Sequence, residues 1–166
     1  MTNMKQMTTK TIELDCMLLD DEPMQSNINN LSALVHDWAL AALVDGITDV
    51  DYWVNFQFMS KEDIQALNKQ FRHKDKPTNV LTFPNNQPFN PEEPFLGDIA
   101  ICTDTLKEEA ANENKSLQDH LAHLVIHSIL HTQGYDHQTD DQAKHMETME
   151  IDLLKQFNIT NPYGDT

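Results

Sequence analysis

Four stretches of the chain carry the patterns of β-strands. Apolar and polar residues alternate from Thr11 to Cys16, and an apolar run from Met17 to Leu19 follows, as expected for a strand with one buried face. Residues 53–59 are rich in aromatic side chains, which favour strands. Two further short apolar stretches follow, and Pro84 ends the first of them. The predicted strands cover residues 11–19, 53–59, 79–83 and 96–102.

Five longer stretches predict helices, because apolar residues recur in them three or four positions apart. Each follows a side chain of a type that commonly caps helices, namely Asn30 or Ser32, Ser60, Thr103, Ser116, and Thr139 or Asp140. The predicted helices cover about residues 31–45, 61–71, 104–114, 117–133 and 140–157. Residues 20–23 should break the chain between elements, and the proline-rich residues 85–94 should form a loop of the length that often covers a site.

The order of these elements predicts a single α+β domain. No internal repeat and no shift in composition marks a second domain. We expect a mixed four-stranded sheet packed with about five helices, with the helix over residues 117–133 lying across one face. Residues 1–10 are predicted to be a disordered start, 11–158 the domain and 159–166 a polar tail. Gly97 and Asp98, at the start of the last strand, indicate a close approach between backbones.

Charge narrows the classes of partner. The 166 residues carry a formal net charge of −16, which argues against indiscriminate binding of nucleic acid, because phosphates are bound by Lys and Arg. The basic residues are unevenly placed, however. Lys69, Arg72, Lys74 and Lys76 fall within eight positions, and Arg72 is the only arginine. This basic island could bind a polyanion, or it could be a solvated loop at the end of a helix.

The sequence also bears on location. No apolar run approaches the length of a membrane span, and residues 1–10 lack the apolar core of a secretion signal. Cys16 and Cys102 lie far apart in apolar contexts, as is typical of reduced core residues. We therefore expect a cytoplasmic protein with no membrane partner, whose oligomeric state the sequence leaves open.

The chemistry of the chain is concentrated in one helix. Residues 121–133 carry no formally charged side chain, and Gly134 is the favoured residue type for a left-handed helix exit. His127 and His131 are four apart and so share a helix face, and the chain reversal at Gly134 allows His137 to return toward them. Three neutral imidazoles can hold a zinc ion and leave its fourth position open for water or substrate, as in catalytic zinc sites.

The spacing His-x-x-x-His-x-x-Gly-x-x-His matches the ligand spacing of the long zinc-protease signature, so we expect a zincin-like metal helix. In that signature a Glu directly after the first His is the general base, and Ser128 stands there instead. The metal ligands are therefore predicted without the peptidase base.

The same residues carry a resemblance to a known family. The block from His127 to His137, with its sequence Gly134-Tyr135-Asp136-His137, resembles that of the YbeY family of bacterial zinc-dependent endoribonucleases. The segment from Asn68 to Pro84 is similar to the family's arginine-containing segment, and Leu96–Cys102 to its Gly-Asp strand. The sequence departs from the family at Ser128, where Gly is usual, and at Thr132, where Leu is usual. The extra Ser128 side chain bears on how closely the helix packs there.

The resemblance implies one Zn²⁺ ion on His127, His131 and His137, with Arg72 in the active cleft. It implies cleavage of single-stranded RNA in maturation of ribosomal RNA, at the 16S rRNA 3′ end, and in ribosome quality control. The implied partners are ribosomal RNA, the small ribosomal subunit and a ribosome-associated protein.

The expected chemistry leaves some roles open. A guanidinium binds two phosphate oxygens and stays charged, so we expect Arg72 to hold the scissile phosphate and stabilise transition-state charge. The general base could be water activated by the metal, Asp98 or His123, and His123 could equally be a hydrogen-bond partner of a ligand or a core histidine. Two alternatives remain, a metallopeptidase-like hydrolase and a non-catalytic ribosome-assembly factor stabilised by zinc.

Overall fold

The computed structural model describes residues 12–85, 92 and 94–164. The predicted disordered start, most of the predicted loop at residues 85–94 and the last two residues of the predicted polar tail lie outside the described residues.

The four predicted strands form one mixed sheet, as expected. They are β1 (Glu13–Leu19), β2 (Asp51–Met59), β3 (Val80–Pro84) and β4 (Phe95–Cys102), in the order β1-β2-β4-β3. β1, β2 and β4 are parallel, and β3 is antiparallel to β4. The antiparallel strand lies at the edge of the sheet, next to the strand that follows it in the sequence.

Six helices occur in the described part of the chain, one more than the approximate number expected. They are α2 (Glu22–Gln25), α3 (Leu31–Ala42), α4 (Lys61–Arg72), α5 (Thr103–Asn112), α6 (Leu117–Thr132) and α7 (Asp140–Lys155). The additional helix is α2, a single turn where we expected only a break. Pro23 is compatible with it, because a proline in the first turn gives up an N–H that has no helical partner anyway.

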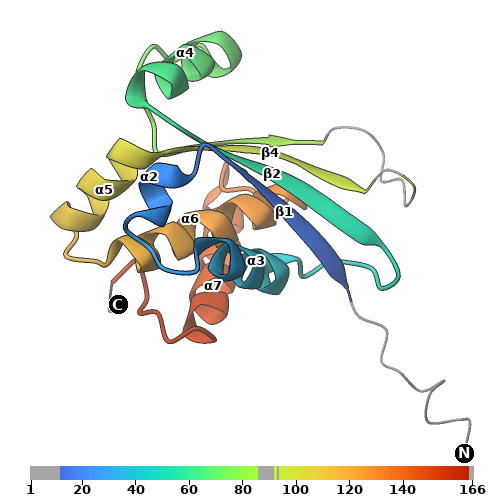
Figure 1. Ribbon diagram of the computed structural model, residues 1–166. Helices are drawn as coiled ribbons and strands as arrows, with labels where there is room; N and C mark the ends of the chain where they lie inside the picture. The colour runs from blue at the N-terminus through green and yellow to red at the C-terminus, as the bar shows by residue number, and fades with distance from the viewer. Residues whose placement is uncertain (1–11, 86–91, 93, 165–166) are drawn as a thin grey trace, which may run out of the picture.

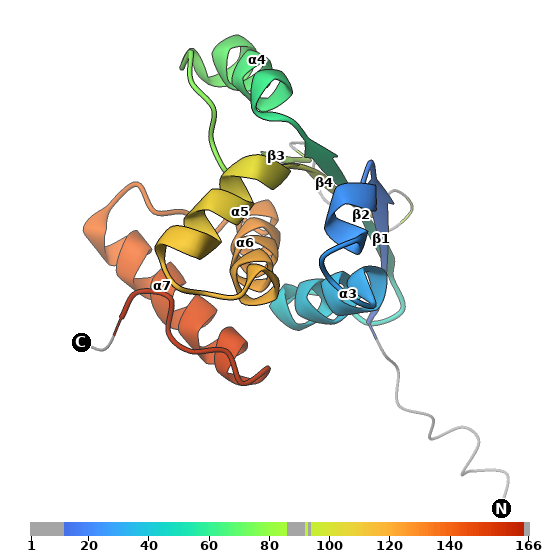
Figure 2. The ribbon, with the colours of Figure 1, turned by 60° about the vertical axis from the view of Figure 1, so that its left-hand side comes forward.

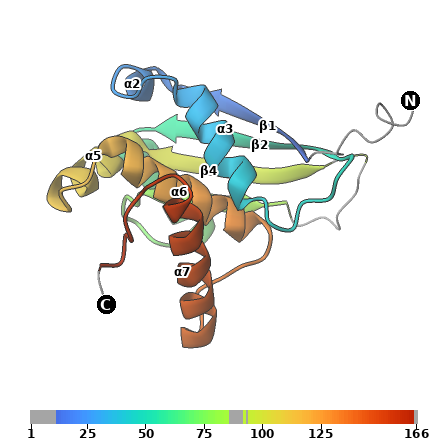
Figure 3. The same ribbon diagram turned by 90° about the horizontal axis from the view of Figure 1, so that it is seen from below.

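The helices cover the two faces of the sheet unequally. α3 and α6 lie on one face, with α5 and α7 beside α6 (Figures 1 and 3), whereas α4 lies on the other side (Figure 1). α6 is surrounded by α3, α5, α7 and the sheet (Figure 2), and nine of its residues are buried. This environment explains the stretch without charged residues, because a charge on such a helix would lose its hydration without gaining a partner.

Glycine at position 97 permits the close pairing of β3 with β4. Gly97 pairs with Pro84 and has a φ of +147°. A Cβ atom built on it would lie 2.4 Å from the carbonyl oxygen of Phe83, a distance that real side chains do not tolerate. The predicted close approach of backbones is confirmed, and it fixes the position of β3, the strand that faces the functional site.

Candidate active site

The C-terminal end of α6 turns the chain back on itself. Gly134 has a φ of +98°, and its backbone N–H donates to the carbonyl of His131 at 3.1 Å. The N–H of Tyr135 donates to the carbonyl of Leu130 at 3.3 Å, which completes a glycine-based helix end. Gln133 fixes the end of the helix to the end of α3 by donating to the carbonyl of Ala42 at 2.7 Å. The residues after Gly134 can therefore lie alongside the last turn of the helix.

The three predicted histidines lie together at this turn. The ring centroids of His127 and His131 are 6.0 Å apart, those of His127 and His137 are 5.5 Å apart, and those of His131 and His137 are 5.9 Å apart. For imidazoles that share one tetrahedral zinc ion through bonds of about 2.0–2.1 Å, the centroids would be about 5 Å apart. The observed centroid distances exceed this value by about 1 Å or less.

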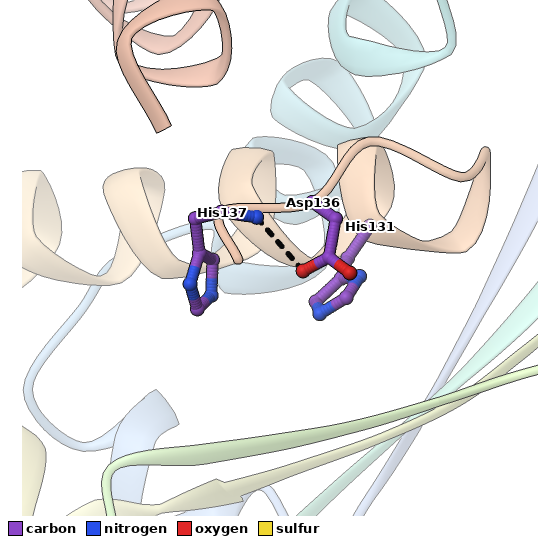
Figure 4. Close-up of side chains that lie close together, drawn as sticks. All are labelled: His131, Asp136 and His137. Atoms are coloured by element: carbon purple, nitrogen blue, oxygen red, sulfur yellow. Dashed lines mark hydrogen bonds between the residues drawn. The ribbon is translucent and has the colours of Figure 1, made fainter. Parts of the chain in front are cut away.

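The carboxylate of Asp136 lies close to the rings of His131 and His137. One ligand atom from each of His131, Asp136 and His137 lies within 4.8 Å of the others, and this group could hold a metal ion. Figure 4 shows the two rings and the carboxylate side by side at the turn, with the backbone N–H of His137 donating to Oδ1 of Asp136 at 2.8 Å. His127 falls outside this tighter group. The Asp136 carboxylate thus fixes the backbone at His137 and is also a potential ligand.

The surroundings of His131 favour its neutral form. Burial is the largest influence and lowers the pKa of His131, and the neighbouring His127 lowers it further, whereas Asp136 opposes the shift. A neutral imidazole has a free lone pair, so His131 can bind a metal without first releasing a proton.

A cleft of about 740 Å³ opens beside the histidines, between β3 and the turn after α6. His127, His131 and His137 line it from one side, and Arg72, Lys74 and Lys76 line it together with β3. Lys69, the remaining member of the basic island, does not line this cleft and lies 3.8 Å from a carboxylate oxygen of Asp75.

Arg72 is held at the cleft by β3. Its Nη2 donates to the carbonyl of Thr82 at 2.8 Å, and its guanidinium carbon lies 5.7 Å from the ring centroid of Phe83. The residue as a whole is exposed, so its other N–H groups remain available to a ligand.

Two other predicted site residues are not brought to the cleft. Asp98 accepts a hydrogen bond from Nδ2 of Asn55 at 3.0 Å and alternates along β4 with Ile99, which faces the helices, so it lies on the opposite face of the sheet from α6. His123 does not line the cleft either and contacts Glu150 instead. Glu150 in turn contacts His127, so His123 reaches a proposed ligand only through this carboxylate.

Ser128, which replaces the peptidase base, is fully buried, and its Oγ has no hydrogen-bond partner among the described residues. It is therefore placed where it can neither contact a substrate in the cleft nor act as a base.

The sequence reasoning missed Glu150, a buried acidic residue of α7. Its carboxylate contacts Nε2 of His123 at 2.5 Å and Nδ1 of His127 at 3.3 Å. Burial alone would raise the pKa of Glu150, but the hydrogen bonds with His123 and His127 outweigh burial and lower the pKa to about 2. A signal was present in the sequence, because Glu150 lies one helical turn from both Met146 and Leu154 in the apolar stripe of the last helix.

Side chains that could hold a metal ion lie at the end of a buried helix and open onto a cleft with three cationic side chains, and this combination defines a class of protein. This is the arrangement of a hydrolytic enzyme that acts on a substrate with phosphate groups.

Comparison with known proteins gives the family. The sequence model of the family endoribonuclease YbeY matches residues 19–158. An endoribonuclease YbeY from Colwellia psychrerythraea is 46% identical over 127 residues, which cover 76% of this chain and 81% of the relative. One from Francisella philomiragia is 41% identical over 157 residues, which cover 92% of this chain and 96% of the relative. The chain belongs to the endoribonuclease YbeY family, which confirms the resemblance seen in the sequence.

A solved structure agrees with the fold. The solution structure of a protein from Thermotoga maritima superposes with a TM-score of 0.54 and 27% sequence identity, covering 92% of this chain and 97% of the other. Within the described residues, no helix is both long and apolar enough to cross a membrane.

Proposed function

We propose that this protein is a zinc-dependent endoribonuclease that cleaves single-stranded RNA during maturation of the 16S rRNA 3′ end and in ribosome quality control. The observation that carries the proposal is the meeting of three histidines with the only arginine of the chain along one cleft. Family membership supports RNA as the substrate. The proposed location is the cytoplasm, and the proposed partners are ribosomal RNA, the small ribosomal subunit and a ribosome-associated protein.

His127, His131 and His137 are the proposed metal ligands. Their nitrogen donors suit zinc, and a three-ligand site leaves a position open for catalysis. When bound, zinc would act as a Lewis acid toward a phosphoryl oxygen and would lower the pKa of a coordinated water molecule. Asp136 is proposed to hold the turn, because its carboxylate already accepts the backbone N–H of His137.

The cationic side chains are proposed to bind and orient the RNA backbone. Arg72 is anchored on the carbonyl of Thr82 and can direct its remaining N–H groups at the scissile phosphate. Lys74 and Lys76 line the same cleft and would contact neighbouring phosphates as point charges. The cleft therefore attracts a polyanion to one place on an otherwise acidic protein.

We assign no side chain as the general base. Asp98 lies across the sheet from the histidines, and His123 is bonded to Glu150 outside the cleft. Of the three candidates considered from the sequence, activation of water at the metal itself is the one that agrees with these positions.

Metal analysis paired with RNA cleavage tests the proposal. We expect the purified protein to contain about one zinc per chain and to cut single-stranded RNA, and we expect His131→Ala to lose both properties. His36→Ala is the matched control, because His36 is a half-exposed histidine on α3 outside the cleft. Absence of RNA cleavage by the zinc-loaded protein would overturn the proposal, whereas chelator-sensitive cleavage of peptides would revive the metallopeptidase alternative.

The ligand set is tested separately. If His127 is a ligand and Asp136 is not, His127→Ala should weaken zinc binding far more than Asp136→Asn. The reverse order would assign zinc to the group His131, Asp136 and His137 instead.

A further inference from the structure

Glu150 of α7 connects one proposed metal ligand to the C-terminal segment. The residue is 1% exposed, and the two oxygens of its carboxylate have different partners. Oε2 lies 3.3 Å from Nδ1 of His127. Oε1 lies 2.5 Å from Nε2 of His123 and accepts a hydrogen bond from the hydroxyl of Tyr163 at 2.8 Å.

We propose that Glu150 is a positioning residue for the metal ligand His127, and that Tyr163 holds Glu150 in place for this role. The inference rests on the proposed function in one respect, namely that His127 binds the metal. The carboxylate of Glu150 faces Nε2 of His123, Nδ1 of His127 and the hydroxyl of Tyr163, and it serves all three as the acceptor, so the hydrogen of His127 lies on Nδ1. Nε2 of His127 is then left without a hydrogen and free to bind a metal at the cleft.

The packing of α7 does not by itself call for a carboxylate at this position. Glu150 lies between Met146 and Leu154 on the buried face of the helix, where an apolar side chain of similar volume would pack. Buried ion pairs are often no more stabilising than apolar replacements, so stability alone is a weak explanation for a buried charge. Orientation of the His127 ring would explain why a carboxylate is buried at position 150, whereas packing does not.

Tyr163 explains how the carboxylate stays in position. Its ring contacts His123 edge-on with centroids 5.4 Å apart, and its hydroxyl donates a hydrogen bond to Oε1 of Glu150. The segment is fixed nearby, because Nζ of Lys115 donates to the carbonyl of Pro162 at 3.4 Å. With Oε1 bonded to His123 and Tyr163, Oε2 is directed at His127. The end of the described chain thereby contributes to the metal centre without contacting the cleft.

Three substitutions separate this role from a purely structural one. Glu150→Gln keeps the shape of the side chain but replaces one carboxylate oxygen by an NH2 group, so the side chain can no longer accept hydrogen bonds from both histidines through two charged oxygens. Tyr163→Phe keeps the ring and removes the hydroxyl that bonds Oε1. Asp152→Asn is the matched control, because Asp152 is an exposed carboxylate on the same helix.

The first measurement is zinc affinity, determined by competition with a chelator. Loss of a hydrogen-bond partner behind a metal ligand typically weakens binding by about 10–100-fold, and we expect this for Glu150→Gln. We expect a smaller loss of a few-fold for Tyr163→Phe and none for Asp152→Asn. If Glu150→Gln does not fold, Glu150→Asp withdraws the carboxylate by one methylene and should show the same loss. Unchanged zinc affinity in a folded Glu150 variant would overturn the inference.

The second measurement is the ¹⁵N chemical shifts of the His127 ring in the metal-free protein. We expect hydrogen on Nδ1 in the wild type and in Asp152→Asn, and a mixture of both tautomers in Glu150→Gln. The Nε2–H tautomer in the wild type would also overturn the inference. These readouts do not involve RNA, so a wild type that binds zinc but cuts no RNA would refute the proposed function while leaving the role of Glu150 intact.

Discussion

Replacement of Arg72 by lysine is the most direct test of how the cleft acts on phosphate. Arg72→Lys preserves the positive charge and most of the side-chain length but removes the planar pair of N–H donors. This difference matters at position 72, because one nitrogen of Arg72 already donates a hydrogen bond to the carbonyl of Thr82. A lysine has a single nitrogen, which cannot hold this anchor and also present a fork to two phosphate oxygens.

The expected loss follows from one hydrogen bond to a charged group. Such a bond contributes about 1.5–3 kcal/mol, and each 1.36 kcal/mol corresponds to about tenfold in rate, so kcat/KM should fall by roughly 10–150-fold. The fold should suffer little, because Arg72 is exposed and loses only the bond to Thr82 and the contact with the Phe83 ring. We expect the free energy of unfolding to fall by no more than about 1 kcal/mol.

The assay measures kcat/KM for cleavage of a single-stranded RNA, together with zinc content and thermal unfolding. Lys69→Ala is the control, because Lys69 comes from the same helix but lies beside Asp75 and does not line the cleft. Full activity of Arg72→Lys at normal zinc content would remove the bidentate role of Arg72. An equal loss in Lys69→Ala would show that overall charge, and not the guanidinium, is what matters.

Three further predictions concern strained backbone positions and buried side chains of the fold. Gly97→Ala should destabilise the fold by about 3 kcal/mol, because the new Cβ would lie 2.4 Å from the Phe83 carbonyl oxygen. Gly134→Ala should cost only about 1 kcal/mol, because its Cβ would meet no atom within 4 Å and the cost comes from the φ of +98° alone. Equal losses in urea unfolding would contradict the backbone argument. Ser128→Ala removes a buried hydroxyl without a partner, so it should stabilise the protein by about 1 kcal/mol and raise Tm by about 2–4 °C, and a lower Tm would mean that the hydroxyl is satisfied. Burial, and then Asp15, raise the pKa of the Cys16 thiol from 9.0 to about 12, so at pH 8 the folded protein should be alkylated at Cys16 about a thousandfold more slowly than the urea-unfolded chain. Similar alkylation rates in the folded and unfolded states would show that the pKa of Cys16 is not raised by folding. Because only the unfolded thiol ionises between pH 9 and about 12, the free energy of unfolding should fall as pH rises through that window.

Local patterns were sufficient for the four strands and the five longer helices, because each of these patterns coincided with the burial that caused it. The alternation in β1 corresponds to a strand with one covered face, and the uncharged stretch of α6 corresponds to a helix enclosed by its neighbours. Helix starts depended on finer geometry. Ser60 and Ser116 cap their helices through the side chain as expected, but Asn30 adopts a left-handed backbone and makes no such bond. A cap depends on backbone angles that the identity of one residue does not determine.

The arrangement of the three histidines was predictable because they are close in the sequence, whereas Arg72 was expected at the cleft from the family resemblance. His127, His131 and His137 are related by one helix and one turn, so their spacing predicts their approach. Asp98 looked equally suitable by chemistry, but the register of β4 directs it to the opposite face, and a shift of one residue along a strand reverses its side. Glu150 is brought to His127 by the packing of α7 against α6, a contact between helices that no short motif encodes.

The distribution of charge explains how so acidic a protein can act on RNA. Several lysines away from the cleft are already neutralised, since Lys61 lies 2.5 Å from Glu108 and Lys115 lies 3.7 Å from Glu113. Arg72, Lys74 and Lys76 line the cleft, and among the described residues no carboxylate lies within 4 Å of their cationic groups. A net charge of −16 repels RNA from most of the surface, while this cleft retains a local attraction close to the histidines. The acidity of the chain is therefore compatible with nuclease activity and confines the encounter with RNA to the place where the proposed metal ligands lie.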